Sequence, residues 1–148
     1  MAAAAPLPQP AGYSGKPAVN KLGYKDGQRV WFIGLPDGLA HLADARAFSN
    51  QTRTDIPTGS HNGDFDLVHW FTKSAADLGT WLEALQQAIA RDGMIWISWP
   101  KKASNVATDV TEDVIRSQAL QLDLVDVKVC AIDEIWSGLK LVIRKDRR

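Results

Sequence analysis

Three short, almost unbroken apolar runs dominate the hydrophobic pattern of the chain, at residues 29–35, 66–72 and 94–99. Such runs are typical of strands that are covered on both faces, as in a parallel sheet. The last run stops at Pro100 and continues into two lysines, a polar loop and a helix start. We therefore expect buried parallel strands, the last of which opens at its C-terminal end into a loop.

Residues with helical spacing separate these runs. The clearest helix is expected over residues 75–91, with Ser74 as its N-cap and Gly93 just after its end. A short Ala-rich helix is expected over residues 39–48. A third helix follows the run at 94–99, and Asp109 is its expected N-cap.

The C-terminal part alternates between apolar and polar residues, which is the pattern of half-buried strands. Strands are expected over residues 124–132 and 139–143, with residues 133–138 as a hairpin connection. The alternation predicts that one face of the first strand carries Val125, Val127, Val129 and Ala131. Residues 49–64 are polar and predict a loop, with one short strand around 53–56.

This order of elements predicts an α/β fold with right-handed crossovers. We expect a Rossmann-like three-layer sandwich, with a mainly parallel sheet of about five strands and a C-terminal antiparallel hairpin. Residues 1–12 are rich in Ala and Pro and predict a disordered tail. The remaining residues, 13–148, are expected to form a single domain.

Composition excludes several classes of protein. Lys plus Arg equals Asp plus Glu at 17 each, which argues against a dedicated nucleic-acid binder. No apolar run approaches the ~20 residues that span a membrane, and the start lacks the basic region of a signal peptide, so we expect a cytoplasmic protein. The single Cys130 excludes an internal disulfide. The three histidines lack metal-ligand spacing, so no metal site is expected.

Two long stretches, WPKKASNVATDVTEDVIR and LDLVDVKVCAIDEIWSGLKLVIRK, resemble an uncharacterised bacterial family, a domain of unknown function found in small cytoplasmic proteins. The opening YSGKPAVNKLGYKDGQRVWFIGLP also resembles the start of that family. The resemblance covers nearly everything after residue 12. It implies no established activity.

LGYKDGQRVWFIG and the terminal hairpin are similar to the Rossmann-like methyltransferases that use S-adenosylmethionine. Those enzymes follow the first strand with a Gly-x-Gly-x-Gly loop, whereas this chain has Gly34 and Gly38 around Pro36, which lacks an amide donor. No acidic residue clearly closes a second strand, and residues 49–64 are too few for the usual strand-helix-strand. The resemblance thus implies the fold and speaks against S-adenosylmethionine, which we do not favour as a cofactor.

The best candidate site lies at the C-terminal end of the run 94–99, because ligands of open α/β sheets bind there. Lys101, Lys102 and Ser104, with the amides of the following helix, can hold an anion such as phosphate. Trp99 can wall such a pocket. The simpler interpretation is a solvated loop with two surface lysines, and it outweighs the anion site on sequence alone.

The hairpin connection supplies the other candidates, Asp133, Glu134, Trp136 and Ser137. Adjacent residues in a strand point to opposite faces, so Asp133 and Glu134 make a poor acid/base pair. Lys16 joins the basic site if the N-terminal arm folds across the sheet edge. The acidic residues around Glu112 either face the lysines or, more simply, stabilise a helix N-terminus.

These features favour a non-catalytic module that binds a small anionic ligand or a protein partner at the edge formed by residues 99–104 and 133–137. The alternative is a group-transfer enzyme with a reduced, degenerate methyltransferase-like fold. A third interpretation is a structural subunit whose exposed strands pair in a dimer. No catalytic residue is identified, so the sequence leans away from an enzyme.

Overall fold

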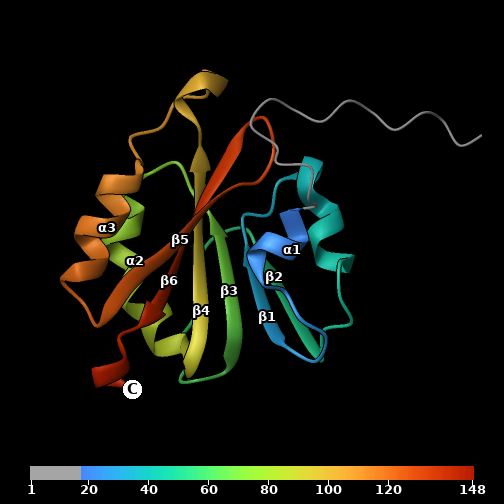
Figure 1. The fold of residues 1–148 in the computed structure, drawn as a ribbon, viewed down its shortest axis with the longest axis vertical. Coiled ribbons are helices and arrows are strands. Elements are labelled where there is room, and N and C mark those ends of the chain that lie inside the picture. The colour runs from blue at the N-terminus through green and yellow to red at the C-terminus, as the bar shows by residue number, and fades with distance from the viewer. Residues whose placement is uncertain (1–17) are drawn as a thin grey trace, which may run out of the picture.

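A computed structural model describes residues 18–148, so the predicted tail at 1–12 and the candidate Lys16 lie outside the described residues. One sheet of six strands has the order β2-β1-β3-β4-β6-β5 (Figure 1). Its strands are Arg29–Ile33 (β1), Asn50–Thr54 (β2), Phe65–Phe71 (β3), Ile89–Pro100 (β4), Leu124–Ala131 (β5) and Trp136–Ile143 (β6). The first four strands are parallel and β6 is antiparallel to both neighbours, which confirms the predicted architecture.

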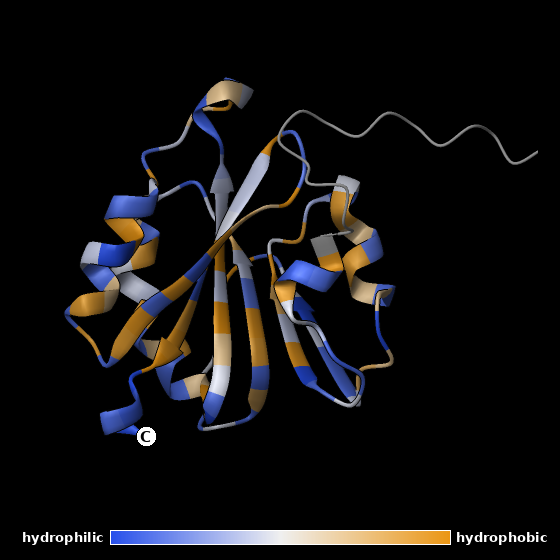
Figure 2. Cartoon of the chain, viewed as in Figure 1, coloured by the Kyte–Doolittle hydropathy of each residue, from blue (hydrophilic) through white to orange (hydrophobic). Residues whose placement is uncertain are grey.

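Helices cover both faces of the sheet and complete the three layers. Helices α2 and α3 lie on one face, and α1 with the 3-10 helix η1 lies on the other (Figure 1). The bounds are Ala18–Leu22 (α1), Ala75–Ala88 (α2), Glu112–Leu120 (α3), Asp37–Asp44 (η1), Lys102–Ser104 (η2) and Lys145–Arg147 (η3). Figure 2 shows the apolar residues concentrated along the central strands.

The central strands bury both of their faces. In β1, Trp31 and Ile33 pack towards α2 and α3, while Val30 and Phe32 join the core below α1 and η1. Side chains alternate across a strand, so covering both faces requires an unbroken apolar run. This confirms the basis on which β1, β3 and β4 were predicted.

Helix α2 stops at Ala88, so its predicted end at residue 91 is wrong. Ile89 is extended (φ −88°, ψ 151°), is buried, and pairs with Phe65 as the first residue of β4. The register of the pairing between β3 and β4 then shifts at a β-bulge. Gly93 lies inside this strand, where an added Cβ would be 3.0 Å from the carbonyl oxygen of Ala90. Its role is close backbone packing rather than the end of a helix.

Two further elements differ from their predicted form. The helix expected over 39–48 is the 3-10 helix η1, with non-helical torsion angles at Leu39 (φ −117°, ψ 15°). The short strand expected around 53–56 is β2, which begins at Asn50 and pairs in parallel with β1. Its side chains are polar, so pairing with β1 rather than an apolar pattern defines it.

Strand β5 does not follow the predicted alternation. Val127 and Val129 are each 52% exposed, and the buried residues are Leu124 and Cys130. The register of the pairing with β6 shifts between Asp126 and Lys128, and β5 lies at the end of the sheet. A bulge reverses which face a side chain occupies, so alternation in the sequence misplaces these valines.

A buried polar network crosses the core below α1. The imidazole of His69 on β3 hydrogen-bonds through Nδ1 to the hydroxyl of Tyr24, and through Nε2 to Oγ of Ser98 on β4 at 2.7 Å. Tyr24 is 3% exposed, and the other two side chains are fully buried. His69 is therefore a hydrogen-bonded core residue, as predicted, and burial lowers its pKa to about 3.

This network predicts acid sensitivity. The pKa of His69 is about 3 in the folded state, against an ordinary value of 6.5, so only the unfolded chain binds the proton between these values. The contribution of His69 to the free energy of unfolding should be complete above pH 6.5. As the pH drops towards 3 the free energy of unfolding should fall, by about 2 kcal/mol between pH 7.5 and 5. Urea unfolding across this range measures the loss.

The variant His69→Gln should flatten that slope, because the amide can hydrogen-bond but does not titrate. The variant His41→Gln changes an exposed histidine and should leave the slope as in the wild type. A wild-type slope in His69→Gln would show that another group carries the pH dependence.

Strand β1 ends in a tight backbone contact at Gly34. This residue has φ +67°, and an added Cβ would be 2.8 Å from the carbonyl oxygen of Phe71 at the end of β3. Its amide donates to the carbonyl oxygen of Thr54 at 2.8 Å, which ties β1 to the end of β2. Only glycine combines this torsion angle with this approach.

We predict that Gly34→Ala destabilises the fold by at least about 1–2 kcal/mol, because the left-handed conformation and the contact with Phe71 both oppose a Cβ. Gly38→Ala is the matched control, since nothing lies within 4 Å of a Cβ there. Denaturant unfolding compares the two variants. Equal stabilities would contradict the described approach of β1 and β3.

Candidate functional site

The sheet has a switch point between β1 and β3. The chain runs from β1 outward to β2 on one side, and from β3 outward to β4 on the other. In open α/β sheets, ligands bind in the crevice beyond the carboxyl ends of the strands at such a point. A cavity of about 400 Å³ lies there, and we call it the switch-point crevice.

Apolar side chains form much of the wall of this crevice. Phe71 stacks on His69, with ring centroids 4.2 Å apart, and meets the edge of Trp136 at 5.4 Å. Ile56, which is 66% exposed, also lines the crevice, together with Pro57. The crevice therefore offers apolar and aromatic surfaces to a ligand, as small-molecule sites commonly do.

Asp55 is the polar residue on this crevice that the sequence analysis missed. It follows the last residue of β2 and is exposed at the rim. The sequence showed no acidic residue that closes a second strand, because the short strand was expected over residues 53–56, with Asp55 inside it. Locating β2 at Asn50–Thr54 corrects that interpretation.

Two residues of the loop after β1, Gly34 and Pro36, have no free amide to offer a ligand. The amide of Gly34 already donates to Thr54, and Pro36 has none. The amide of Leu39 donates to the carbonyl oxygen of Pro36 at 2.9 Å, which closes a turn. The amides of Leu35, Asp37 and Gly38 have no backbone acceptor, so the loop keeps these three donors and loses those of Gly34 and Pro36.

The N-terminus of α2 forms another part of the wall. Ser74 caps the helix, because its Oγ accepts from the amide of Asp77 at 3.1 Å, as the sequence predicted. Asp109 was expected to cap α3, and this is wrong. Its Oδ1 accepts from the amide of Ala75 at 2.7 Å, while Thr111 caps α3 by accepting from Val114.

The structure brings together the lysine loop and the hairpin connection. The amide of Lys101 donates to the carbonyl oxygen of Ile135 at 2.6 Å, and Pro100 pairs with Trp136. Both segments lie at the top of the molecule in Figure 1, where β4 ends. Trp136 also lines the switch-point crevice, so the two candidate regions adjoin.

Several predicted site residues are already engaged in packing or hydrogen bonds within the protein. Trp99 packs in the core below α2 and α3, with 8% exposed. Oγ of Ser104 donates to the carbonyl oxygen of Lys101 at 2.6 Å. Oδ1 of Asp133 accepts from the amides of Ile135 and Trp136 at 2.9 and 2.7 Å. These groups therefore hold the two loops in shape.

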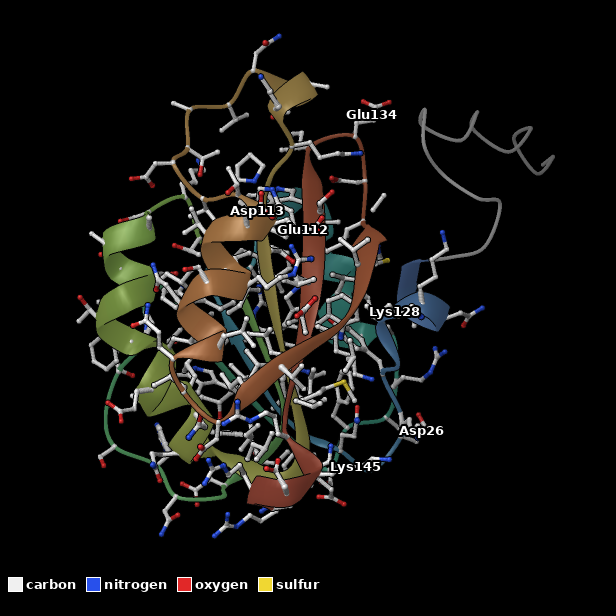
Figure 3. All side chains as sticks on the ribbon, turned by 60° about the vertical axis from the view of Figure 1, so that its left-hand side comes forward. Asp26, Glu112, Asp113, Lys128, Glu134 and Lys145 are labelled. Atoms are coloured by element: carbon white, nitrogen blue, oxygen red, sulfur yellow. The ribbon has the colours of Figure 1, made fainter. Side chains whose placement is uncertain are left out.

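The other predicted residues reach the surface. Lys102 and Glu134 are exposed, while Lys101 and Ser137 are half-buried. Figure 3 shows Glu134 at the tip of the hairpin connection. These are the side chains through which the edge can meet a partner.

The acidic residues at the start of α3 pair with Arg116 rather than with the lysines. Its guanidinium binds Glu112 at 2.5 Å, Asp113 at 3.0 Å and Asp126 at 3.0 Å. The hydrogen bonds to Glu112 and Asp126 raise the pKa of Arg116. Figure 3 shows Glu112 and Asp113 on the first turn of α3, away from the hairpin tip.

Another hollow, of about 460 Å³, lies at the opposite end of the sheet around Gln86, Arg91 and Asp123. It is larger, but the amino ends of the strands are not where ligands of this architecture bind. In the described part of the chain, no three His, Cys, Asp or Glu residues are grouped as metal ligands. Within residues 18–148, no helix is long and apolar enough to cross a membrane.

No protein-family model and no curated protein matches the chain, so the resemblance to an uncharacterised bacterial family stays a prediction. Solved structures do match. A methyltransferase of Aquifex aeolicus that depends on S-adenosylmethionine (SAM) has a TM-score of 0.65 at 10% identity, over 85% of this chain and 87% of that one.

A TehB-like SAM-dependent methyltransferase of Corynebacterium glutamicum has a TM-score of 0.60 at 10% identity, over 85% of each chain. Magnesium protoporphyrin IX methyltransferase of Synechocystis PCC 6803, solved with bound SAM, has a TM-score of 0.59 at 14% identity, over 85% of this chain and 74% of that one. At these identities the likeness establishes the fold alone: a Rossmann-like, methyltransferase-like α/β sandwich.

Proposed function

We propose that this chain is a non-catalytic module that binds a small nucleoside-like ligand in the switch-point crevice. One observation carries the proposal: a cavity of about 400 Å³ lies where the strand order reverses, at the carboxyl ends of β1 and β3. It combines aromatic walls with a few polar groups at the rim, which suits a flat organic ligand.

The nucleoside class follows from Asp55. An exposed carboxylate at the end of β2 can accept hydrogen bonds from two neighbouring hydroxyl groups, such as those of a ribose. A purine ring can contact the small exposed parts of Phe71 and Trp136, which are 6% and 8% exposed, and the side chain of Ile56, which is 66% exposed. The nucleoside half of SAM, which the Synechocystis methyltransferase binds, therefore fits the residues present.

The position of the buried histidine supports the non-catalytic module. His69 has the side chain best suited to move a proton, yet it is sealed behind Phe71 and bonded to Tyr24 and Ser98. A general base must come within hydrogen-bond reach of its substrate. The loop after β1 also offers fewer donors to a charged cofactor tail, because the amide of Gly34 is taken and Pro36 has none.

The alternative is a group-transfer enzyme with a reduced, degenerate methyltransferase-like fold. It is favoured by the likeness to SAM-dependent methyltransferases and by Asp55. Accumulation of S-adenosylhomocysteine from SAM in the presence of the pure protein would support this alternative over the non-catalytic module.

The proposed binding edge extends past Trp136 to the lysine loop. Lys101 and Lys102 can hold an anionic group of a ligand or an acidic segment of a protein partner. Glu134 and the 40% exposed Ile135 lie beside them on the hairpin connection. This edge remains the candidate anion site and protein contact that the sequence predicted.

We predict that adenosine, SAM or S-adenosylhomocysteine raises the melting temperature of the protein. A ligand at ~100 times its dissociation constant adds about 2.7 kcal/mol, or roughly 5–10 °C for a domain of this size. Asp55→Asn should remove most of the shift, because its side-chain amide is a weaker acceptor for hydroxyl groups. Asp44→Asn removes a charge from an exposed position outside the crevice lining and should keep it. A flat response to all three compounds would refute the nucleoside site.

The lysine loop is tested separately with inorganic phosphate. The double variant Lys101→Ala/Lys102→Ala should weaken phosphate binding at least about tenfold, since charge-assisted hydrogen bonds are lost. Lys145→Ala, an exposed lysine near the C-terminal end, is the control. Titration followed by phosphorus NMR measures the affinity. Equal affinities in the wild type and the double variant would remove the lysine loop as the anion site.

A further inference from the structure

The N-terminus of α2 opens onto the switch-point crevice, with Ser74 and Asp77 in its wall. A helix of this length ordinarily presents free amides and a positive dipole end there, which together attract phosphate groups. Phosphorylated nucleosides would therefore be expected to direct their phosphates to this helix end. The contacts around it show a different arrangement.

Three amides at this helix end are already bound by side chains. The amide of Ser74 donates to Oγ1 of Thr72 at 3.3 Å, that of Ala75 to the carboxylate of Asp109 at 2.7 Å, and that of Asp77 to Oγ of Ser74 at 3.1 Å. One of these acceptors, Asp109, is itself an anion. It takes up an amide of the helix end that a phosphate oxygen could otherwise bind.

Asp109 is held in this position by its neighbours. Oγ1 of Thr108 donates to the carbonyl oxygen of Lys73 at 2.9 Å, and the amide of Asp109 donates to the same oxygen at 3.3 Å. Val110, the next residue, is 1% exposed and packs in the core. The segment is thus anchored on both sides of Asp109, which restricts the carboxylate from swinging away for a ligand.

Charge at the rim reinforces the effect. Asp55 and Asp77 line the crevice, and Asp109 lies on the helix end beside them, against one lysine in the lining, Lys73. All four side chains are exposed, so their net negative charge opposes a nearby anion with a strength that water and salt screen. A phosphate dianion would find three of the amides at this helix end taken and would meet this acidic rim, whereas an uncharged or cationic ligand would not be repelled.

We infer that the switch-point crevice accepts uncharged or cationic nucleoside-like ligands and rejects phosphorylated ones, with Asp109 as the residue that sets this preference. The inference rests on the proposed nucleoside site. It names the ligand class of that site and assigns selectivity to a residue from the connection between β4 and α3, outside the crevice lining.

The experiment compares adenosine with AMP by isothermal titration calorimetry on the wild type, Asp109→Asn and Asp113→Asn. Asparagine keeps the oxygen that accepts from Ala75, so the helix cap is retained and only the charge is lost. Asp113→Asn is the matched control, because it removes an exposed charge from the first turn of α3. Each titration is repeated in the Lys101→Ala/Lys102→Ala background, so that phosphate held at the lysine loop does not count as crevice binding.

In that background we expect the wild type to bind adenosine at least about tenfold more tightly than AMP. Asp109→Asn should reduce this ratio about tenfold with little change for adenosine, and Asp113→Asn should leave it unchanged. Equal affinities of the wild type for adenosine and AMP, or an unchanged ratio in Asp109→Asn, would overturn the inference while the nucleoside site stands. No binding of either compound to any variant would overturn the nucleoside site, and this inference with it.

Discussion

The hydrogen-bonded chain of Tyr24, His69 and Ser98 is the constraint on which the arrangement of the sheet depends. Each member is a buried polar group that is costly to leave unpaired, and each comes from a different segment. A neutral imidazole offers one donor and one acceptor, so it satisfies both hydroxyl groups in a single tautomer. The network therefore fixes β3, β4 and the segment before β1 relative to one another, in a way that apolar packing alone would not.

Neighbouring contacts are adapted to this network. The indole nitrogen of Trp96 donates to the carbonyl oxygen of Leu22 at 2.8 Å, which pins the end of α1 over the same face of the sheet. Gly138 on β6 lies opposite Ser98, where a Cβ would be 3.0 Å from its Oγ. Phe71 stacks on the imidazole and also lines the crevice, so the network holds this part of the wall in place. The core thus shapes the candidate site while keeping its histidine out of reach.

The local sequence pattern predicted the strands that are buried on both faces. It failed for elements that are defined by hydrogen bonds to residues distant in the sequence. Apolar runs in the sequence predict β1, β3 and β4, and leucines at helical spacing predict α2. β2 is polar, so only its pairing with β1 identifies it, and Asp55 was missed with it. Asp109 resembled a cap for the following helix because a capping pattern is local, whereas its real partner, Ala75, is distant in sequence.

The fold and the site carry different amounts of functional information. The likeness to methyltransferases follows from the sheet and its crossovers, and many unrelated activities share such a frame. Two features of this chain lie in its loops: Pro36 offers no amide after β1, and Asp109 takes up the amide of Ala75 at the start of α2. Both features reduce the number of free amides near the crevice, while Phe71 and Trp136 still line it. A crevice with fewer free amides suits a flat, uncharged group better than a phosphate, which is why we propose a nucleoside as its ligand. SAM carries no phosphate, so a direct test for group transfer, rather than this geometry, separates the two proposed functions.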